Sequence, residues 1–189
     1  SGAMGLPVLS MRPRLPRSLL AGAIAAVLCV AHPVASAQAG GGADPDTLKV
    51  AFIYNFTRYA TWSTPGAPGF VLCSTERNAL RGRLASLNGR PVGAETIEVR
   101  QGVEPGAVRQ CHMLFVGQAD SRRLFDYLRA VRGAPVLTVS DIADSAGSGV
   151  AIELVETDQR MRIAVNRQAS EQAGIALGAQ LLRLALAVY

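Results

Sequence analysis

The stretch His112-Met113-Leu114-Phe115-Val116 is a short run in which polar and apolar residues do not alternate. A strand that is apolar on both faces is typical of the centre of a parallel sheet, because helices cover both faces of such a sheet. Residues 135–139 have the same character, and residues 121–132 between the two runs have the apolar spacing of a helix. Strand, helix and strand in this order predict a parallel βαβ unit.

Helices and strands alternate upstream in the same way. The apolar residues between 46 and 62 recur at spacings of three and four, which predicts a helix capped by Asp46 or Thr47. A strand over 70–73, a helix over 76–87, an edge strand over 95–100 and a short turn or helix over 105–109 follow. In the helix over 121–132, the spacing places four residues toward the core: Leu124, Phe125, Leu128 and Val131.

The last third of the chain departs from this alternation. Residues 150–155 and 161–165 predict an antiparallel hairpin at the edge of the sheet. Asn166 caps the next helix, and the leucine-rich segment from Leu177 to Val188 predicts a closing helix. The expected fold is α/β: a three-layer sandwich with a mostly parallel sheet, flanked by helices, and a C-terminal antiparallel hairpin.

A basic segment, an apolar segment and small residues follow one another near the start of the chain. Residues 11–17 are basic, 18–31 are apolar, and Ala35-Ser36-Ala37 is an A-x-A site, which together predict a secretory signal peptide over 11–37. Residues 1–10 are interpreted as an expression scar and 38–45 as a flexible lead-in. The expected mature chain has one domain, 46–189, because about 150 residues make an ordinary domain.

Charge and composition exclude several functions. The full chain has 19 basic and 14 acidic residues, and removing Arg12, Arg14 and Arg17 with the signal leaves 16 basic residues. So small an excess, without an aromatic ladder, argues against a nucleic-acid partner. Only His112 remains as a mature histidine, inside an apolar run, where a buried structural role is favoured over catalysis. We expect neither a metal site nor a cofactor, and not an enzyme.

Cys73 and Cys111 remain as an even pair once Cys29 has left with the signal. Export to an oxidising compartment favours a disulfide over two reduced buried thiols. The strand assignments raise a geometric difficulty, because Cys73 ends one strand and Cys111 precedes another. In adjacent parallel strands in register, the two would lie beyond disulfide reach, unless the strands are staggered.

Four blocks in this order resemble the YfiR family: Lys49-Val50-Ala51-Phe52-Ile53-Tyr54-Asn55-Phe56 followed by Trp62; Cys111-His112-Met113-Leu114-Phe115-Val116; Val136-Leu137-Thr138-Val139-Ser140-Asp141; and Ile163-Ala164-Val165-Asn166 with Gln180-Leu181-Leu182-Arg183-Leu184-Ala185. The resemblance implies a periplasmic protein that binds the periplasmic part of an inner-membrane diguanylate cyclase of the YfiN type. The protein would repress this cyclase and so lower cyclic di-GMP and biofilm formation. It also implies that an outer-membrane lipoprotein sequesters the repressor, and that Cys73 and Cys111 match the family's paired cysteines.

Two groups of residues are candidates for binding a partner or a ligand. Arg58, Tyr59 and Trp62 combine a guanidinium with aromatic rings near the end of the first helix, a mixture common at interface hot spots, or else they pack that helix end on the sheet. Ser140 and Asp141 follow a strand at its carboxyl end, where ligands bind in open α/β sheets. The alternative for this pair is a loop or cap hydrogen bond.

Self-association is expected through the closing helix, because Leu181, Leu182 and Leu186 exceed a one-face apolar stripe. The predicted assembly is a homodimer. Beside the repressor, the alternative function is a periplasmic sensor whose cleft holds a nucleotide or an aromatic metabolite. A hydrolase using Asp141 is disfavoured by the single mature histidine.

Overall fold

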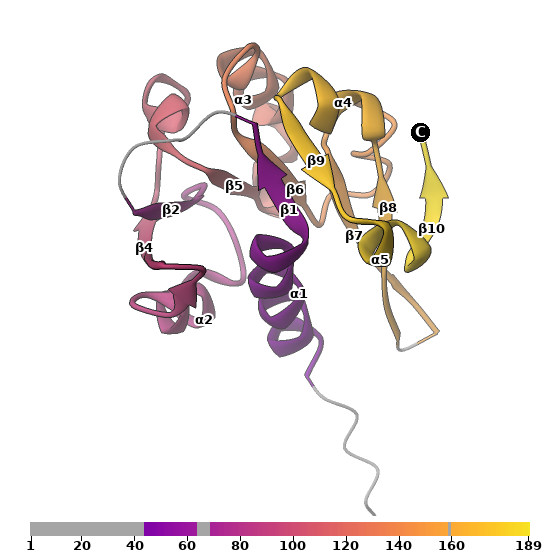
Figure 1. Cartoon of the computed structure of the whole chain (residues 1–189), viewed down its shortest axis with the longest axis horizontal. Helices are drawn as coiled ribbons and strands as arrows, with labels where there is room; N and C mark the ends of the chain where they lie inside the picture. The colour runs from indigo at the N-terminus through magenta and orange to yellow at the C-terminus, as the bar shows by residue number, and fades with distance from the viewer. Residues whose placement is uncertain (1–43, 64–68, 159) are drawn as a thin grey trace, which may run out of the picture. The chain divides into compact units, whose positions relative to one another are not determined.

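The strand β5, Met113–Val116, lies inside an eight-stranded sheet, between β2, Phe70–Ser74, and β6, Leu137–Ser140. This computed structural model describes residues 44–63, 69–158 and 160–189 (Figure 1). The signal peptide and nearly all of the lead-in predicted from the sequence therefore lie outside the described residues. The central position of β5 confirms that an unbroken apolar run marks a buried strand.

The order of strands in the sheet is β10-β8-β7-β6-β5-β2-β4-β3. The other members are β3, Pro91–Val92; β4, Glu95–Gln101; β7, Ile152–Thr157; β8, Arg160–Val165; and β10, Ala185–Val188. Pairing is parallel from β4 through β2, β5 and β6 to β7, and again between β8 and β10. The pairs β7–β8 and β3–β4 are antiparallel. The mostly parallel α/β fold with its C-terminal hairpin is confirmed.

One face of the sheet packs against α1, Pro45–Tyr59, and several short helices: α2, Arg81–Leu84; η1, Ala85–Leu87; α4, Arg167–Gln172; and α5, Ala179–Arg183. Ile53 and Phe56 of α1 are fully buried against this face. Figure 1 shows α1 in front of the sheet and α3 behind it. Asp44 accepts a hydrogen bond from the Thr47 backbone, so the helix begins earlier than the predicted caps.

The other face packs against η2, Pro105–Gln110; η3, Gln118–Arg123; and α3, Leu124–Val131. The inward residues of α3 are Leu124, Tyr127 and Val131, whereas Phe125 is 62% exposed. The predicted burial of Phe125 is wrong. Leu124, Tyr127 and Val131 form the buried face of α3, and Phe125, one position further around the helix from Leu124, turns toward solvent.

The predicted first helix ends too late, because residues 60–62 form a strand. β1, Ala60–Trp62, pairs antiparallel with β9, Ile175–Leu177, in a separate two-stranded sheet. The helix predicted over 76–87 is also too long, since only residues 81–87 are helical. The Asp120 carboxylate accepts from the Arg77 backbone and the Asn78 amide donates to the Thr75 carbonyl, which fixes the start of this segment as a turn.

The predicted closing helix is wrong, because residues 175–188 form β9, α5 and β10 in succession. Gly174 has a φ of 70°, which ends α4 and starts an extended segment. In β10, half-buried alanines at 185 and 187 alternate with exposed Leu186 and Val188, which is a strand pattern. The edge of the sheet is consequently β10, and the β7–β8 hairpin lies one strand further in.

Candidate functional site

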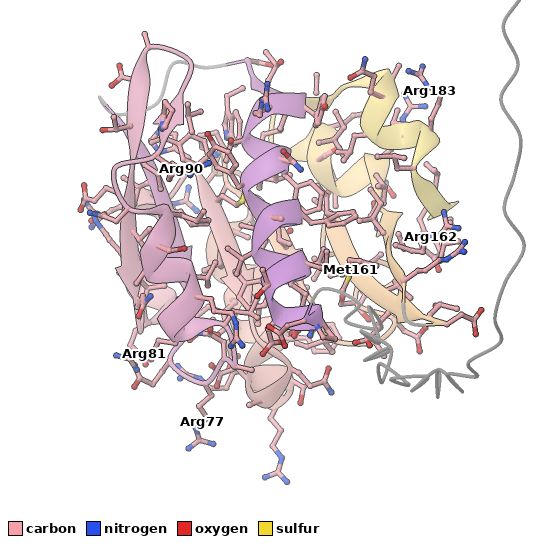
Figure 2. All side chains as sticks on the ribbon, turned by 90° about the horizontal axis from the view of Figure 1, so that it is seen from below. Arg77, Arg81, Arg90, Met161, Arg162 and Arg183 are labelled. Carbon is pink, nitrogen blue, oxygen red and sulfur yellow. A yellow bond between two sulfur atoms is a disulfide. The ribbon has the colours of Figure 1, made fainter. Side chains whose placement is uncertain are left out.

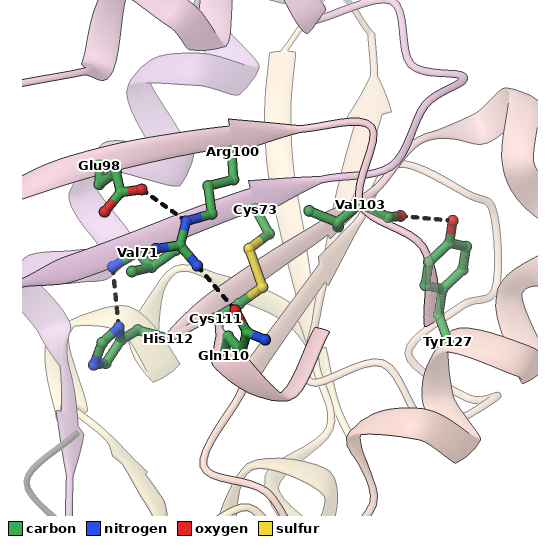
Figure 3. Close-up of a disulfide and its surroundings, with 9 residues drawn as sticks. All are labelled: Val71, Cys73, Glu98, Arg100, Val103, Gln110, Cys111, His112 and Tyr127. Carbon is green, nitrogen blue, oxygen red and sulfur yellow. Dashed lines mark hydrogen bonds and ion pairs between the residues drawn. A yellow bond between two sulfur atoms is a disulfide. The ribbon is translucent and has the colours of Figure 1, made fainter. Parts of the chain in front are cut away.

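Cys73 and Cys111 form a disulfide with a Cα–Cα distance of 5.9 Å (Figure 3). Cys73 belongs to β2, while Cys111 follows η2 and precedes the first residue of β5. Because η2 packs against the face of β2, with Val108 in the same apolar cluster, Cys111 reaches Cys73 from that face and not along a strand. The disulfide is confirmed, and the geometric difficulty expected from the strand assignments does not arise.

A hydrogen-bonded group surrounds this disulfide. Arg100 of β4 donates to the Glu98 carboxylate at 2.7 Å and to the Gln110 side chain at 3.3 Å, joining β4 to the end of η2 (Figure 3). The hydrogen bond from Arg100 lowers the pKa of Glu98. On the helical side, the Tyr127 hydroxyl donates to the Val103 carbonyl, and burial raises the pKa of Tyr127. Cys73 and Cys111 are both buried, so the disulfide lies in the core and stabilises the fold.

His112, which immediately precedes β5, is buried beside the start of β2. Its Nδ1 accepts a hydrogen bond from the Val71 backbone at 3.0 Å, and its ring stacks on Phe70 at 5.3 Å between centroids. Burial lowers the pKa of the imidazole. The prediction that His112 is a buried structural histidine is confirmed.

Arg58, Tyr59 and Trp62 do not share one environment. Arg58 is exposed in the last turn of α1, and Tyr59 is half-buried against the core. Trp62 is also half-buried; its indole N–H donates to the Pro135 carbonyl at 3.0 Å, and its ring meets the edge of Phe70. Trp62, in β1 just after α1, thus packs against the main sheet, which agrees with the alternative interpretation of a packing role. Arg58 is the exposed member of this group that a partner can reach.

Ser140 and Asp141 lie at the carboxyl end of β6, as the sequence predicted, but their polar atoms bind other parts of the chain. The Ser140 hydroxyl donates to the Val116 carbonyl at 2.8 Å and accepts from the Ile142 backbone. Asp141 accepts from the Gln118 backbone at 2.7 Å and forms an ion pair of 2.9 Å with Lys49 of α1. These contacts tie α1 and the loop after β5 to the end of β6, which supports the loop interpretation for this pair.

Leu181, Leu182 and Leu186 are distributed over two elements. Leu181 is buried in the core beneath α5, Leu182 is half-buried, and Leu186 is exposed on β10. A second chain can therefore contact Leu186 directly, but it cannot contact the buried Leu181.

A cavity of about 460 Å³ lies between α3 and α4, and the sequence did not indicate it. Phe125, Arg129 and Arg132 line it on the α3 side, and Gln172 lines it on the α4 side. It lies toward the amino ends of β6 and β7, opposite the end where Ser140 and Asp141 were proposed to bind a ligand. Phe125 lines this cavity and is exposed, whereas the sequence predicted that it is buried.

Two structural features bear on the class of protein. Among the residues that the structure describes, no three His, Cys, Asp or Glu side chains gather where they could hold a metal ion. In the same residues, no helix has both the length and the apolar composition needed to cross a membrane.

A family model described as YfiR/HmsC-like matches residues 46–186, from the start of α1 into β10. The chain belongs to the YfiR/HmsC-like family. The match covers the main sheet, the disulfide and both helical layers, which confirms the resemblance seen in the four sequence blocks. A search of curated proteins found no match. Membership in the YfiR/HmsC-like family indicates a periplasmic regulator of a diguanylate cyclase.

Proposed function

We propose that this chain represses a membrane-bound diguanylate cyclase by binding the cyclase's periplasmic part, and so lowers cyclic di-GMP and biofilm formation. The family match over residues 46–186 is the observation that carries this proposal. A repressor of this kind works through its surface, and the polar groups at the carboxyl ends of the strands support that mode, because Ser140 and Asp141 are engaged within the fold.

Arg58 is the proposed partner contact on α1, because its guanidinium is exposed and ends a helix that is anchored along its length by buried residues. Asp141 would act behind the surface, by holding α1 in place through its ion pair with Lys49. Ser140 would act there by joining the ends of β5 and β6. A homodimer and sequestration by an outer-membrane lipoprotein are further parts of the proposal. The signal peptide predicted over residues 11–37 of this chain would direct it to the periplasm.

Cross-linked affinity capture from cell envelopes tests the repressor function. We expect the chain to recover an inner-membrane protein with a cytoplasmic diguanylate cyclase domain. Deletion of the gene that encodes this chain, the proposed repressor, should raise cyclic di-GMP. Arg58→Glu should reduce the recovery of this cyclase, while Arg77→Glu, an exposed arginine at the other end of the sheet strands, serves as the matched control. Recovery of the chain's own cross-links alone, with unchanged cyclic di-GMP in the deletion strain, would contradict the proposal.

A small-ligand sensor is a second candidate function, because the cavity between α3 and α4 combines an exposed phenyl ring with two guanidinium groups. Phe125 can stack on an aromatic ring, and Arg129 and Arg132 can bind a carboxylate or phosphate. Calorimetric titration with adenosine monophosphate and with indole-3-acetate tests this function. Binding that Arg132→Ala weakens would support a sensor, and no heat from either compound would count against it.

A further inference from the structure

The two edges of the main sheet differ in how well they are protected. At one edge, β3 has two residues, of which Pro91 lacks a backbone N–H. Short edge strands and proline are devices that prevent a sheet from pairing with another chain. At the other edge, β10 has four residues and no proline, and it runs parallel to β8 with a register shift between Ala185 and Ala187, after which Ala187 and Val188 pair regularly. Within the described residues, β10 is therefore the edge that remains open to a further strand.

The backbone of β10 has hydrogen-bonding groups that point away from the sheet. Tyr189 donates its N–H to the Val165 carbonyl of β8, and its carbonyl accepts from the N–H of Arg167, the first residue of α4, so both of its backbone groups face toward the sheet. Backbone groups alternate sides along a strand, so the N–H and C=O of Val188 face outward. An added strand can pair with these groups.

Large apolar side chains gather on the same edge. Among the described residues, the structure has five large hydrophobic side chains that are exposed, and four of them lie on or beside β10: Leu184, Leu186, Val188 and Tyr189. Scattered single residues of this kind are ordinary on a surface, but a contiguous group marks an interaction site. The side chains of an added strand would cover them.

The charge around β10 indicates the chemistry of its partner. Arg160, Arg162 and Leu186 line a depression of about 440 Å³ on one face of the edge, together with Asp158 and Thr157. Arg183 precedes β10, and Figure 2 shows Arg162 and Arg183 reaching outward beside the yellow C-terminal ribbon. Within the described residues, these three arginines form no ion pair. Glu156 lies on the opposite face of β7 from Val155, the register partner of Arg162, so of the residues that the structure describes Asp158 is the one carboxylate that lines this depression beside Arg160 and Arg162. With Arg183 next to β10, the edge is basic as well as apolar.

We propose that β10 is a docking edge for an extended segment of a partner protein, which adds to the sheet as a further strand and alternates apolar side chains with carboxylates. Main-chain pairing would supply affinity, and the arginines would select the acidic segment. A second copy of this chain fits this edge less well, because pairing two β10 edges would bring Arg162 and Arg183 of both copies together. The proposed homodimer would therefore form without pairing of the two β10 edges. This inference rests on the proposed function only for the identity of the partner.

Synthetic peptides test the docking edge without the cyclase. A labelled peptide of alternating valine and glutamate is titrated with the chain by fluorescence anisotropy, beside a peptide of alternating valine and lysine. Val188→Pro removes the outward N–H and leaves the bonds of Tyr189 to β8 intact. The pair Arg162→Glu with Arg183→Glu reverses the charge, and Arg77→Glu, which Figure 2 places at a different corner, is the matched control.

We expect the glutamate peptide to bind, Val188→Pro and the double charge reversal each to weaken binding by about tenfold, and Arg77→Glu to leave it unchanged. Equal binding of both peptides, or full binding by Val188→Pro, would overturn the proposal. Sedimentation showing a dimer that Val188→Pro dissociates would overturn it in favour of a second copy. Failure of these tests would leave capture of the cyclase unaffected, so the docking edge and the proposed function are tested separately.

Discussion

The Cys73–Cys111 disulfide closes a loop that contains β4 and η2, with a sequence separation of 38 residues. In the chain-entropy model, a loop of this length stabilises the folded state by about 4 kcal/mol, because it restricts the unfolded chain. We expect Cys73→Ala with Cys111→Ala to lose about this much free energy of unfolding. Urea denaturation followed by the fluorescence of Trp62, the sole tryptophan, measures the loss. The wild-type chain in reductant should lose a similar amount, and a loss below about 1 kcal/mol would contradict the entropic account.

His112 gives the stability of the fold a dependence on pH. Burial lowers its pKa below 6.5, so the unfolded chain binds a proton at a pH where the folded chain does not. The free energy of unfolding should therefore decrease as the pH falls below 6.5, until the folded pKa is reached, and be regained as the pH rises. His112→Asn keeps an acceptor near the Val71 N–H and removes the titrating group. Urea denaturation over this range should show a flatter pH profile for the variant; an unchanged profile would assign the dependence to other groups.

Ser140 and Asp141 show how far a candidate site can be predicted residue by residue. Their place at the carboxyl end of a strand follows from the apolar run before them, and the structure confirms it. Their partners do not follow, because Lys49 lies 92 positions away and meets Asp141 only when α1 packs on the sheet. Phe125 illustrates the same limit, since its side chain faces outward because Leu124, Tyr127 and Val131 are the residues of α3 that pack on the sheet.

At the scale of elements, Asn166 joins α4 to the loop before β7. Its side-chain oxygen accepts from the Ala169 backbone at 2.8 Å, which is the helix cap predicted from the sequence, and its amide donates to the Ala146 carbonyl. We expect Asn166→Ala to cost about 2 kcal/mol, because it removes both bonds. Asn166→Asp keeps the cap and loses the second bond, so it should cost less. Urea denaturation of both variants measures the difference, and equal losses would mean that the cap contributes little.

The elements that the sequence predicted are the long or strongly apolar ones. Six strands of the main sheet, β2 and β4 through β8, lie where the sequence predicted them, β4 from its alternation of polar and apolar residues and the others from apolar or extended runs. Strands of two to four residues at the periphery were missed: β1, β3, β9 and β10. In β10 the alternation of alanine with larger residues was visible, but the leucines at 177, 181 and 184 also fit helical spacing, and only pairing with β8 decides between the two.

At the scale of the whole molecule, stability and compartment depend on each other. The disulfide joins elements on the side of the sheet where η2 and α3 pack, while α1 and the C-terminal segment cover the opposite face without a covalent link. A chain that folds in a reducing compartment would lack that link. The proposed signal peptide over 11–37 and the disulfide are therefore linked, because the disulfide forms when the chain folds after export to an oxidising compartment.

Expression of the full chain in a bacterium tests this dependence. We expect the intact mass of the periplasmic product to begin at Gln38 and to show Cys73 and Cys111 oxidised, because cleavage follows the A-x-A site and the compartment is oxidising. Ala37→Leu should block cleavage and keep the product with the membrane fraction, since the site needs a small residue. A chain that begins at residue 44 and is kept in the cytoplasm should fold with free thiols and be less stable by about 4 kcal/mol. A periplasmic product that retains residues 11–37, or that has free thiols, would contradict the link between export and stability.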